Sequence, residues 1–239
     1  MEELYNDIMT MQPRYKTFGE ALFWTYATRQ AIATAANSGE DTIGKKFYVF
    51  RQIFYNKFKS GKQHITDLYD MNKRKLRAGN ICFYCHGEVP KEDLTADHVF
   101  PRVKGGTNDM DNIIFVCKSC NSSKGKKDLI EWFLLNRGEL PSPFVLGHYF
   151  RQIYQYAVEH DLMAKDFEEV CQMSLPFNPH CLMILSNTQA RQHYFQRALR
   201  EKENEDYDNN KKRRVTPPNN SQRNNPYCDL LGFNIRVQN

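Results

Sequence analysis

The stretch CFYCHGEVPKEDLTADHVFPRVKGGTNDMDNIIFVCKSCNSSKGKKD, residues 82–128, decides how this chain folds. Two Cys-x-x-Cys pairs bracket it, Cys82 with Cys85 and Cys117 with Cys120. Each pair makes a tight turn that presents two sulfurs to one point, and four thiolates suit a tetrahedral structural Zn²⁺. Two equal pairs seldom coincide by chance, so four unliganded thiols are the disfavoured alternative. The spacing therefore predicts a structural zinc held by these four cysteines.

A second set of side chains lies between and just after the cysteine pairs. Asp97 and His98 are adjacent, Asn112 follows in the same segment, and Asn121 comes directly after Cys120. Carboxylate and amide oxygens suit a hard ion, Mg²⁺ or Mn²⁺. A histidine beside such an ion is placed to take a proton from water. Two kinds of metal chemistry in one short segment indicate a nuclease.

The local pattern of this segment predicts two short strands and a helix. The β-branched runs around Asp97 and Asn112 read as strands, joined by a loop that holds a Gly-Gly pair, and a helix is expected to start near Cys117. A strand places Asp97 and His98 on opposite faces. Both serve one substrate if the strand lies on the floor of a groove. The neighbouring zinc ligand would hold Asn121 in position.

The order and spacing of these residues carry a family resemblance. Residues 82–128 resemble the ββα-metal domain of HNH endonucleases, with Asp97-His98, a central Asn112, and Asn121 in the final position that is often histidine. The cysteine pairs match the zinc-stabilised branch of that family. The segment is also similar to the HNH domain of RNA-guided Cas nucleases, which has asparagine in the last position. Standalone HNH proteins of bacterial restriction and anti-phage defence systems are further relatives that the resemblance suggests.

The resemblance implies a role for each of these side chains. His98 would be the general base that deprotonates the attacking water. Asp97 and Asn121 would bind one catalytic Mg²⁺ or Mn²⁺, and Asn112 would brace the loop and keep the imidazole oriented. The products would carry a 5′-phosphate and a 3′-hydroxyl.

The positive charge of the chain gathers around this segment. The formal net charge is +5, and residues 71–127 alone hold eleven Lys and Arg against six Asp and Glu, so the whole excess falls there. A basic region around a candidate site favours a polyanionic substrate. The candidates for phosphate contacts are Arg102, Lys104, Lys124, Lys126 and Lys127. For each one, the alternative interpretation is a solvated surface charge.

The remainder of the chain reads as helical, so the expected fold is mainly α with a small α+β insert. Thr17 and Glu20 have the spacing of a capping box. A helix over residues 42–59 is expected to carry a stripe of four phenylalanines on one face. The predicted domains are a helical region (1–80), the HNH-like domain with its zinc site (81–137), a second helical region (138–200), a disordered linker (201–226) and an apolar tail (227–239).

Composition excludes several classes of protein. No stretch reaches the ~20 apolar residues that a membrane span needs. The acidic start of the chain lacks an apolar signal region, so we expect a cytoplasmic protein. Seven cysteines in that compartment are not expected to form a disulfide framework. Cys171, Cys181 and Cys228 therefore read as small buried apolar side chains.

Three functional hypotheses follow from the sequence. The leading one is a metal-dependent endonuclease, with DNA favoured over RNA. The second is a zinc-stabilised nucleic-acid-binding module without catalysis, which is weakened because binding alone requires none of Asp97, His98 and Asn121. The third is a nuclease subunit that a protein partner, such as a defence-system ATPase, activates through the helical flanks and the tail.

Overall fold

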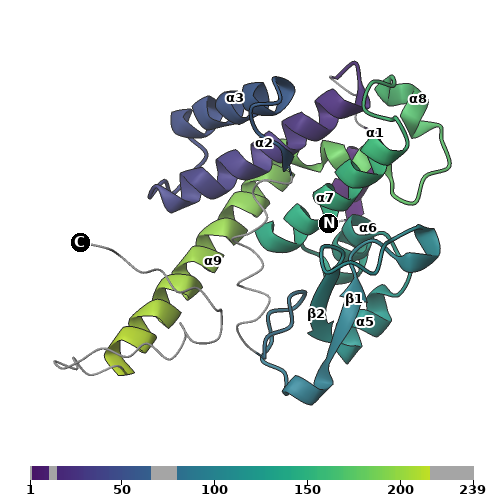
Figure 1. The fold of residues 1–239 in the computed structure, drawn as a ribbon. Coiled ribbons are helices and arrows are strands. Elements are labelled where there is room, and N and C mark those ends of the chain that lie inside the picture. Colours follow the sequence, from purple (N-terminus) through teal and green to yellow (C-terminus); the bar gives the residue numbers. More distant parts are fainter. Residues whose placement is uncertain (1, 11–14, 66–79, 216–239) are drawn as a thin grey trace, which may run out of the picture. The chain divides into compact units, whose positions relative to one another are not determined.

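The structure, a computed structural model, describes residues 2–10, 15–65 and 80–215, and it confirms a mainly helical fold with a small α+β insert. The chain divides into two compact units, Met1–Lys202 and Glu203–Asn239. Figure 1 shows the helices and strands of the chain, and side-chain contacts are described for the first unit. Among the described residues, no helix combines the length and the apolar character that crossing a bilayer requires.

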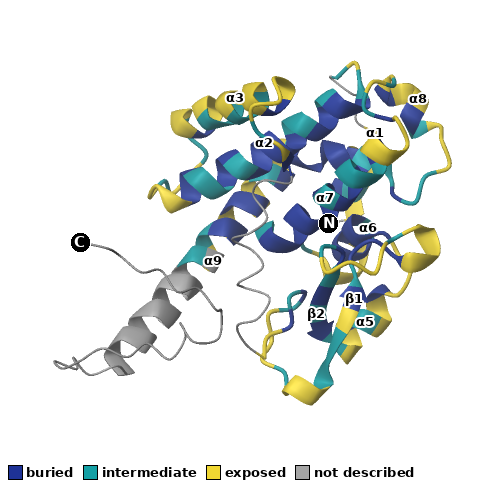
Figure 2. Cartoon of the chain, in the orientation of Figure 1, coloured by how far each residue is buried: buried dark blue, intermediate teal, exposed yellow. Residues whose placement is uncertain are grey.

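Among the described residues, three helices precede the insert: α1 (Glu2–Thr10), α2 (Phe18–Asn37) and α3 (Lys45–Lys59). The helix α2 begins where the capping box predicts, because the backbone N–H of Glu20 donates to Thr17 Oγ1 at 3.2 Å. Figure 2 shows α2 largely buried, whereas the outer side of α3 is exposed. The two helices pack side by side.

The predicted phenylalanine stripe of α3 faces the body of the protein. Phe47 and Phe58 are buried, and Phe50 and Phe54 are half-buried against the core. Helical spacing brings these four rings to one face of α3. The stripe therefore attaches α3 to α2.

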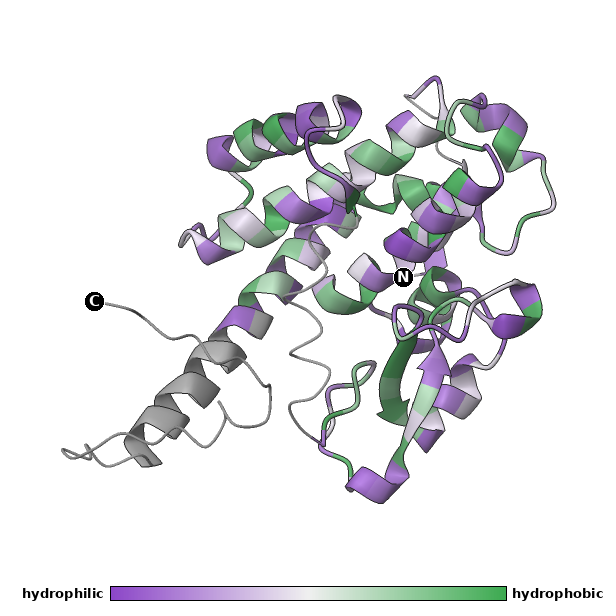
Figure 3. Ribbon diagram, viewed as in Figure 1, coloured by the Kyte–Doolittle hydropathy of each residue, from purple (hydrophilic) through white to green (hydrophobic). Residues whose placement is uncertain are grey.

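The insert is a β-hairpin followed by a helix, as the sequence predicts. The strands β1 (Leu94–His98) and β2 (Ile113–Cys117) are antiparallel, with His98 opposite Ile113. The helix α5 (Lys118–Lys124) starts directly after β2 and packs against both strands. In Figure 3, β2 is strongly hydrophobic and α5 largely hydrophilic, so the hairpin presents an apolar strand to the core and polar residues to the outside.

Up to residue 215, where the described part of the chain ends, six elements follow the insert: α6 (Leu129–Trp132), η4 (Phe133–Arg137), α7 (Pro143–Glu159), α8 (Phe167–Cys171), η5 (Pro179–Ser186) and α9 (Thr188–Val215). Asp128 caps α6 as expected, because its Oδ1 accepts the N–H groups of Ile130 and Glu131 at 2.9 and 3.2 Å. The π-helical turn η4 continues α6 and ends at Gly138, whose φ is +64°. Both α7 and η5 pack against α2 and complete the core.

The structure differs from the sequence-based expectation at the C-terminal side. The helix α9 runs to Val215, so residues 201–215 are helical rather than a disordered linker. No Gly or Pro occurs between Thr188 and Val215, and Glu, Lys and Arg are good helix formers. A polar composition alone does not separate a solvated helix from a disordered segment. Residues 216–226 of the predicted linker, and the apolar tail with Cys228, lie outside the described residues.

Candidate active site and metal centre

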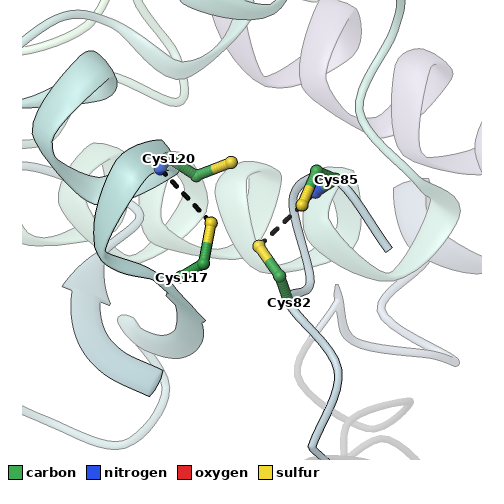
Figure 4. Close-up of side chains that lie close together, drawn as sticks. All are labelled: Cys82, Cys85, Cys117 and Cys120. Atoms are coloured by element: carbon green, nitrogen blue, oxygen red, sulfur yellow. Dashed lines mark hydrogen bonds between the residues drawn. The ribbon is translucent and has the colours of Figure 1, made fainter. Parts of the chain in front are cut away.

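The four cysteines converge on one point, as the spacing predicts. Their Sγ atoms all lie within 4.8 Å of one another (Figure 4). The backbone N–H of Cys85 donates to Cys82 Sγ at 3.5 Å, and that of Cys120 donates to Cys117 Sγ at 3.4 Å. Four sulfurs bound at ~2.3 Å around one tetrahedral ion would be about 3.8 Å apart, so the cluster fits zinc.

Burial of the sulfur atoms favours a bound cation at this cluster. Loss of solvation raises the pKa of the Cys82 and Cys120 thiols. Zinc binds thiolates, and its charge supplies the stabilisation that water no longer gives them. The donor set and its burial therefore both suit a structural metal.

The two residues between Cys82 and Cys85 attach this turn to the helices. The ring of Phe83 stacks on Phe144 of α7, with centroids 4.8 Å apart. The ring of Tyr84 lies 5.1 Å from that of Trp132 in α6. The turn at residues 82–85 is thus packed against α6 and α7 in the core.

Asp97 is buried, and both of its contacts reach the same oxygen. Its Oδ2 accepts a hydrogen bond from Tyr84 Oη at 2.5 Å and pairs with Lys124 Nζ at 3.0 Å. Neither contact uses Oδ1. Lys124 Nζ also donates to the backbone oxygen of His98 at 2.8 Å. The described contacts therefore fix the carboxylate through Oδ2 alone.

The charges around Asp97 follow from burial. Loss of solvation raises the pKa of Tyr84 well above its ordinary value, and the Asp97 charge raises it further, so Tyr84 remains a neutral donor. Loss of solvation also lowers the pKa of Lys124, while the Asp97 carboxylate opposes that shift. The Lys124 side chain is 0% exposed, so it lies in the interior and not at the surface position from which we expected it to contact phosphate.

Asn121 lies on the same side of β1 as Asp97. Its Nδ2 donates to Thr95 Oγ1 at 2.9 Å and approaches the backbone oxygen of Ala96 at 3.4 Å. Thr95 and Asp97 are two residues apart in a strand, so they face the same way, toward α5. The amide oxygen of Asn121 is the atom that these two bonds do not use. Asp97 and Asn121 thus each offer one oxygen on the α5 side of the hairpin.

His98 ends β1 and is partly exposed. Its Nε2 lies 3.0 Å from Oδ1 of Asn108, a residue of the loop between the strands. The structure thus places a polar partner on the imidazole that the sequence analysis missed. The available signal was an asparagine two residues after the Gly105-Gly106 pair, where the loop turns back toward β1.

Asn112 is fully buried and joins the two ends of that loop. Its Oδ1 accepts the N–H of Phe100 at 2.7 Å, and its Nδ2 donates to the backbone oxygens of Phe100 and Thr107, both at 2.9 Å. A Cβ on Gly106 would lie 1.8 Å from the oxygen of Phe100, so only glycine fits there. These contacts are those of a brace, the role that the resemblance implies for Asn112.

Comparison with known proteins assigns this segment to a family. A sequence model of the HNH endonuclease family matches residues 82–129, the span that holds the cysteine cluster, the hairpin and α5. Residues 82–129 are an HNH endonuclease domain. Members of this family are phosphodiesterases.

A relative of the HNH domain is also found among known proteins. The chain is 36% identical over 73 residues to the CRISPR-associated endonuclease Cas9 of Corynebacterium diphtheriae. The similarity covers 30% of this chain and 7% of that protein. No solved structure matches the chain. The helical segments on either side of the HNH domain are therefore not assigned by these comparisons.

The remaining basic candidates lie at the surface of the HNH domain. Arg102 and Lys104 are exposed in the turn after β1, and Lys126 and Lys127 are exposed after α5. Lys127 Nζ donates to the backbone oxygen of Ser123 at 3.1 Å and to Asn136 at 2.9 Å. These four side chains stay candidates for phosphate contacts.

Proposed function

We propose that this chain is a divalent-metal-dependent endonuclease that hydrolyses DNA and leaves a 5′-phosphate and a 3′-hydroxyl. The observation that carries the proposal is the placement of Asp97, His98 and Asn121 in one HNH domain. Asp97 and Asn121 each keep one oxygen that the protein does not use, on the α5 side of β1. A binding module without catalysis has no need of this set.

Each residue has a distinct part in the proposed reaction. His98 takes a proton from the attacking water, a contribution of roughly 10²–10⁴-fold for a positioned base. Asp97 and Asn121 would hold Mg²⁺ or Mn²⁺, and such an ion would supply charge neutralisation on the phosphate and the leaving oxygen. Two oxygen ligands make a weak Mg²⁺ site, so the substrate phosphate is expected to strengthen binding. The exposed basic side chains around the hairpin attract the polyanion.

Cleavage of supercoiled plasmid tests the proposal. Purified protein is incubated with plasmid and Mg²⁺ or Mn²⁺, and we expect nicked or linear DNA that disappears with a chelator. His98→Ala should cut about 10²–10⁴-fold more slowly. The matched control is His193→Ala, which changes an exposed histidine of α9 and should cut at the wild-type rate. Equal rates for His98→Ala and the wild type would contradict the assignment of the base.

Two further arms define the substrate and the products. A nick that DNA ligase seals without prior treatment has a 5′-phosphate and a 3′-hydroxyl, as expected. An RNA of the same sequence should be cut more slowly than the DNA. Binding of plasmid without cleavage under any metal would favour a nuclease subunit that a protein partner, such as an ATPase, activates.

We propose bacterial restriction or anti-phage defence as the setting of this activity. The support is the 73-residue similarity to a CRISPR-associated endonuclease. Phage plating on bacteria that express the chain is the direct measurement. We expect fewer plaques with the wild type than with His98→Ala, and equal plaque numbers would remove defence as the setting.

A further inference from the structure

Asn108, in the loop between β1 and β2, contacts the imidazole of His98 with its side chain. Asn108 lies ten positions after His98 in sequence, yet its Oδ1 is 3.0 Å from His98 Nε2. The amide oxygen is an acceptor only, so Nε2 must carry the proton in this contact. A neutral imidazole protonated at Nε2 has its lone pair at Nδ1. The contact thus selects which nitrogen is able to accept a proton.

The backbone on either side of Asn108 is fixed by one buried residue. Asn112 binds the carbonyl oxygen of Thr107 through its side chain at 2.9 Å, and its backbone N–H donates to the oxygen of Asp109 at 2.8 Å. Thr107 and Asp109 are the two neighbours of Asn108 in sequence. Asn108 is therefore held from both sides, although its own side chain is exposed.

The same brace also reaches the strand that carries His98. The backbone N–H of Val99, the residue after His98, donates to the backbone oxygen of Asn112 at 2.8 Å. Asn112 thereby fixes the distance between the end of β1 and the Asn108 loop. A rigid scaffold of this kind is what an exposed hydrogen bond needs to hold one geometry, because water otherwise competes for both partners.

We propose that Asn108 is a positioning residue that keeps the proton of His98 on Nε2 and directs Nδ1 at the attacking water. This inference rests on the proposed function, in which His98 is the general base. It also gives Asn112 a specific task. Asn112 orients the imidazole through Asn108, which it holds in place by the bonds to Thr107 and Asp109.

Two substitutions at Asn108 separate positioning from a merely structural role. Asn108→Ala removes the acceptor, and loss of such a supporting hydrogen bond is expected to slow plasmid nicking about 10–100-fold with little change in the half-saturating plasmid concentration. Asn108→Asp keeps an oxygen acceptor, so it should recover a large part of the lost rate. A merely structural role would give equal losses in the two variants and would also raise the half-saturating plasmid concentration.

The second measurement does not depend on cleavage. The ¹⁵N chemical shifts of the His98 ring in metal-free protein, with the signals assigned by their absence in His98→Ala, report which ring nitrogen carries the proton. We expect the proton on Nε2 in the wild type and a loss of that preference in Asn108→Ala. Asn56→Ala, the same truncation in α3 outside the HNH domain, is the matched control and should leave the ring tautomer unchanged.

Together, the two measurements distinguish failure of the role of Asn108 from failure of the proposed nuclease function. An unchanged ring tautomer in Asn108→Ala, or equal nicking rates for Asn108→Ala and the wild type, overturns the role of Asn108. A tautomer that depends on Asn108 in a protein that cuts no DNA retains the contact and refutes the nuclease proposal.

Discussion

Two buried aspartates, Asp97 and Asp128, accept a hydrogen bond from a buried tyrosine, yet the structure uses them differently. Asp128 Oδ2 binds Tyr149, and its Oδ1 binds two N–H groups of α6 and lies 3.6 Å from Cys181 Sγ. Both oxygens of Asp128 are therefore used by the protein. Asp97 receives Tyr84 and a lysine on one oxygen only.

This difference separates a carboxylate that builds the fold from one that is proposed to bind a metal ion. A helix cap and a tyrosine satisfy Asp128 completely, so it stabilises the junction of α6, α7 and η5. The bonds of Tyr84 and Lys124 to Oδ2 hold the Asp97 carboxylate in one orientation, which a metal ligand requires. The other oxygen, Oδ1, is the atom at which Mg²⁺ or Mn²⁺ is proposed to bind.

Removal of zinc should produce the largest difference between the region around Asp97 and the region around Asp128. A structural zinc contributes roughly 10–16 kcal/mol of apparent binding energy, and Tyr84 lies between two of its ligands. We expect a strong chelator to release about one zinc per chain and to abolish hydrogen-exchange protection in the hairpin around Asp97. Protection in α7, which carries the partner of Asp128, should persist.

Cysteine variants provide the control for zinc removal. Cys117→Ser should lose the metal, whereas Cys171→Ser, outside the cluster, should retain it. Equal loss of protection in the hairpin and in α7 would show that the two aspartates belong to one cooperative unit.

Substitution of each aspartate by asparagine should have the next largest effect. Asp97→Asn removes the charge that holds the ion, and we expect nicking to fall about 10²–10³-fold and Mn²⁺ binding, followed by electron paramagnetic resonance, to weaken. Asn is as good a helix cap as Asp, so Asp128→Asn should cost about 1–2 kcal/mol of unfolding free energy through its bond to Tyr149. Asp128→Asn should bind Mn²⁺ as tightly as the wild type. Weakened Mn²⁺ binding in both variants would show that Asp97 and Asp128 do not differ as metal ligands.

A smaller effect is expected when each tyrosine loses only its hydroxyl. Tyr84→Phe and Tyr149→Phe both keep the ring, both lie at fully buried positions, and each should cost about 1–3 kcal/mol of unfolding free energy in urea titration. Tyr84→Phe alone frees the Asp97 carboxylate to turn. The Mg²⁺ concentration for half-maximal nicking should rise about 10-fold in that variant. An equal rise in Tyr149→Phe would mean that general loosening, and not orientation of Asp97, sets the metal requirement.

The smallest effect is a dependence of stability on alkaline pH. Burial raises the pKa of Tyr84 and of Tyr149 well above the ordinary value of 10.0. Above pH 10 the unfolded chain therefore loses protons that the folded protein keeps. The unfolding free energy is insensitive to these groups below pH 10 and falls above it, by at most ~1.36 kcal/mol per pH unit for each tyrosine.

Urea unfolding at pH 9, 10 and 11 measures this dependence. Above pH 10, the unfolding free energy of each tyrosine-to-phenylalanine variant should fall less steeply with pH than that of the wild type, by up to ~1.36 kcal/mol per pH unit. If only one variant does, the two tyrosines are not equivalently buried.

The sequence predicted the hairpin, the start of α5 and the cysteine cluster because each follows from local spacing. Two Cys-x-x-Cys pairs define a metal site wherever the chain between them runs, and Gly105-Gly106 marks the turn. The missed features depend on contacts between distant segments. Lys124 was expected at the surface, although its spacing of three from Asn121 in a helix places both side chains on the face toward β1.

By itself, the sequence determined which chemical groups this protein has for metals and for proton transfer, because ligand type and spacing are local properties of the chain. Only the tertiary structure decided which atoms of those groups remain open. Tyr84 and Lys124 come from different elements and occupy one oxygen of Asp97, while Asn108 comes from a loop and occupies one nitrogen of His98. Such bonds require distant segments to be held at hydrogen-bonding distance, and packing around the hairpin supplies that constraint.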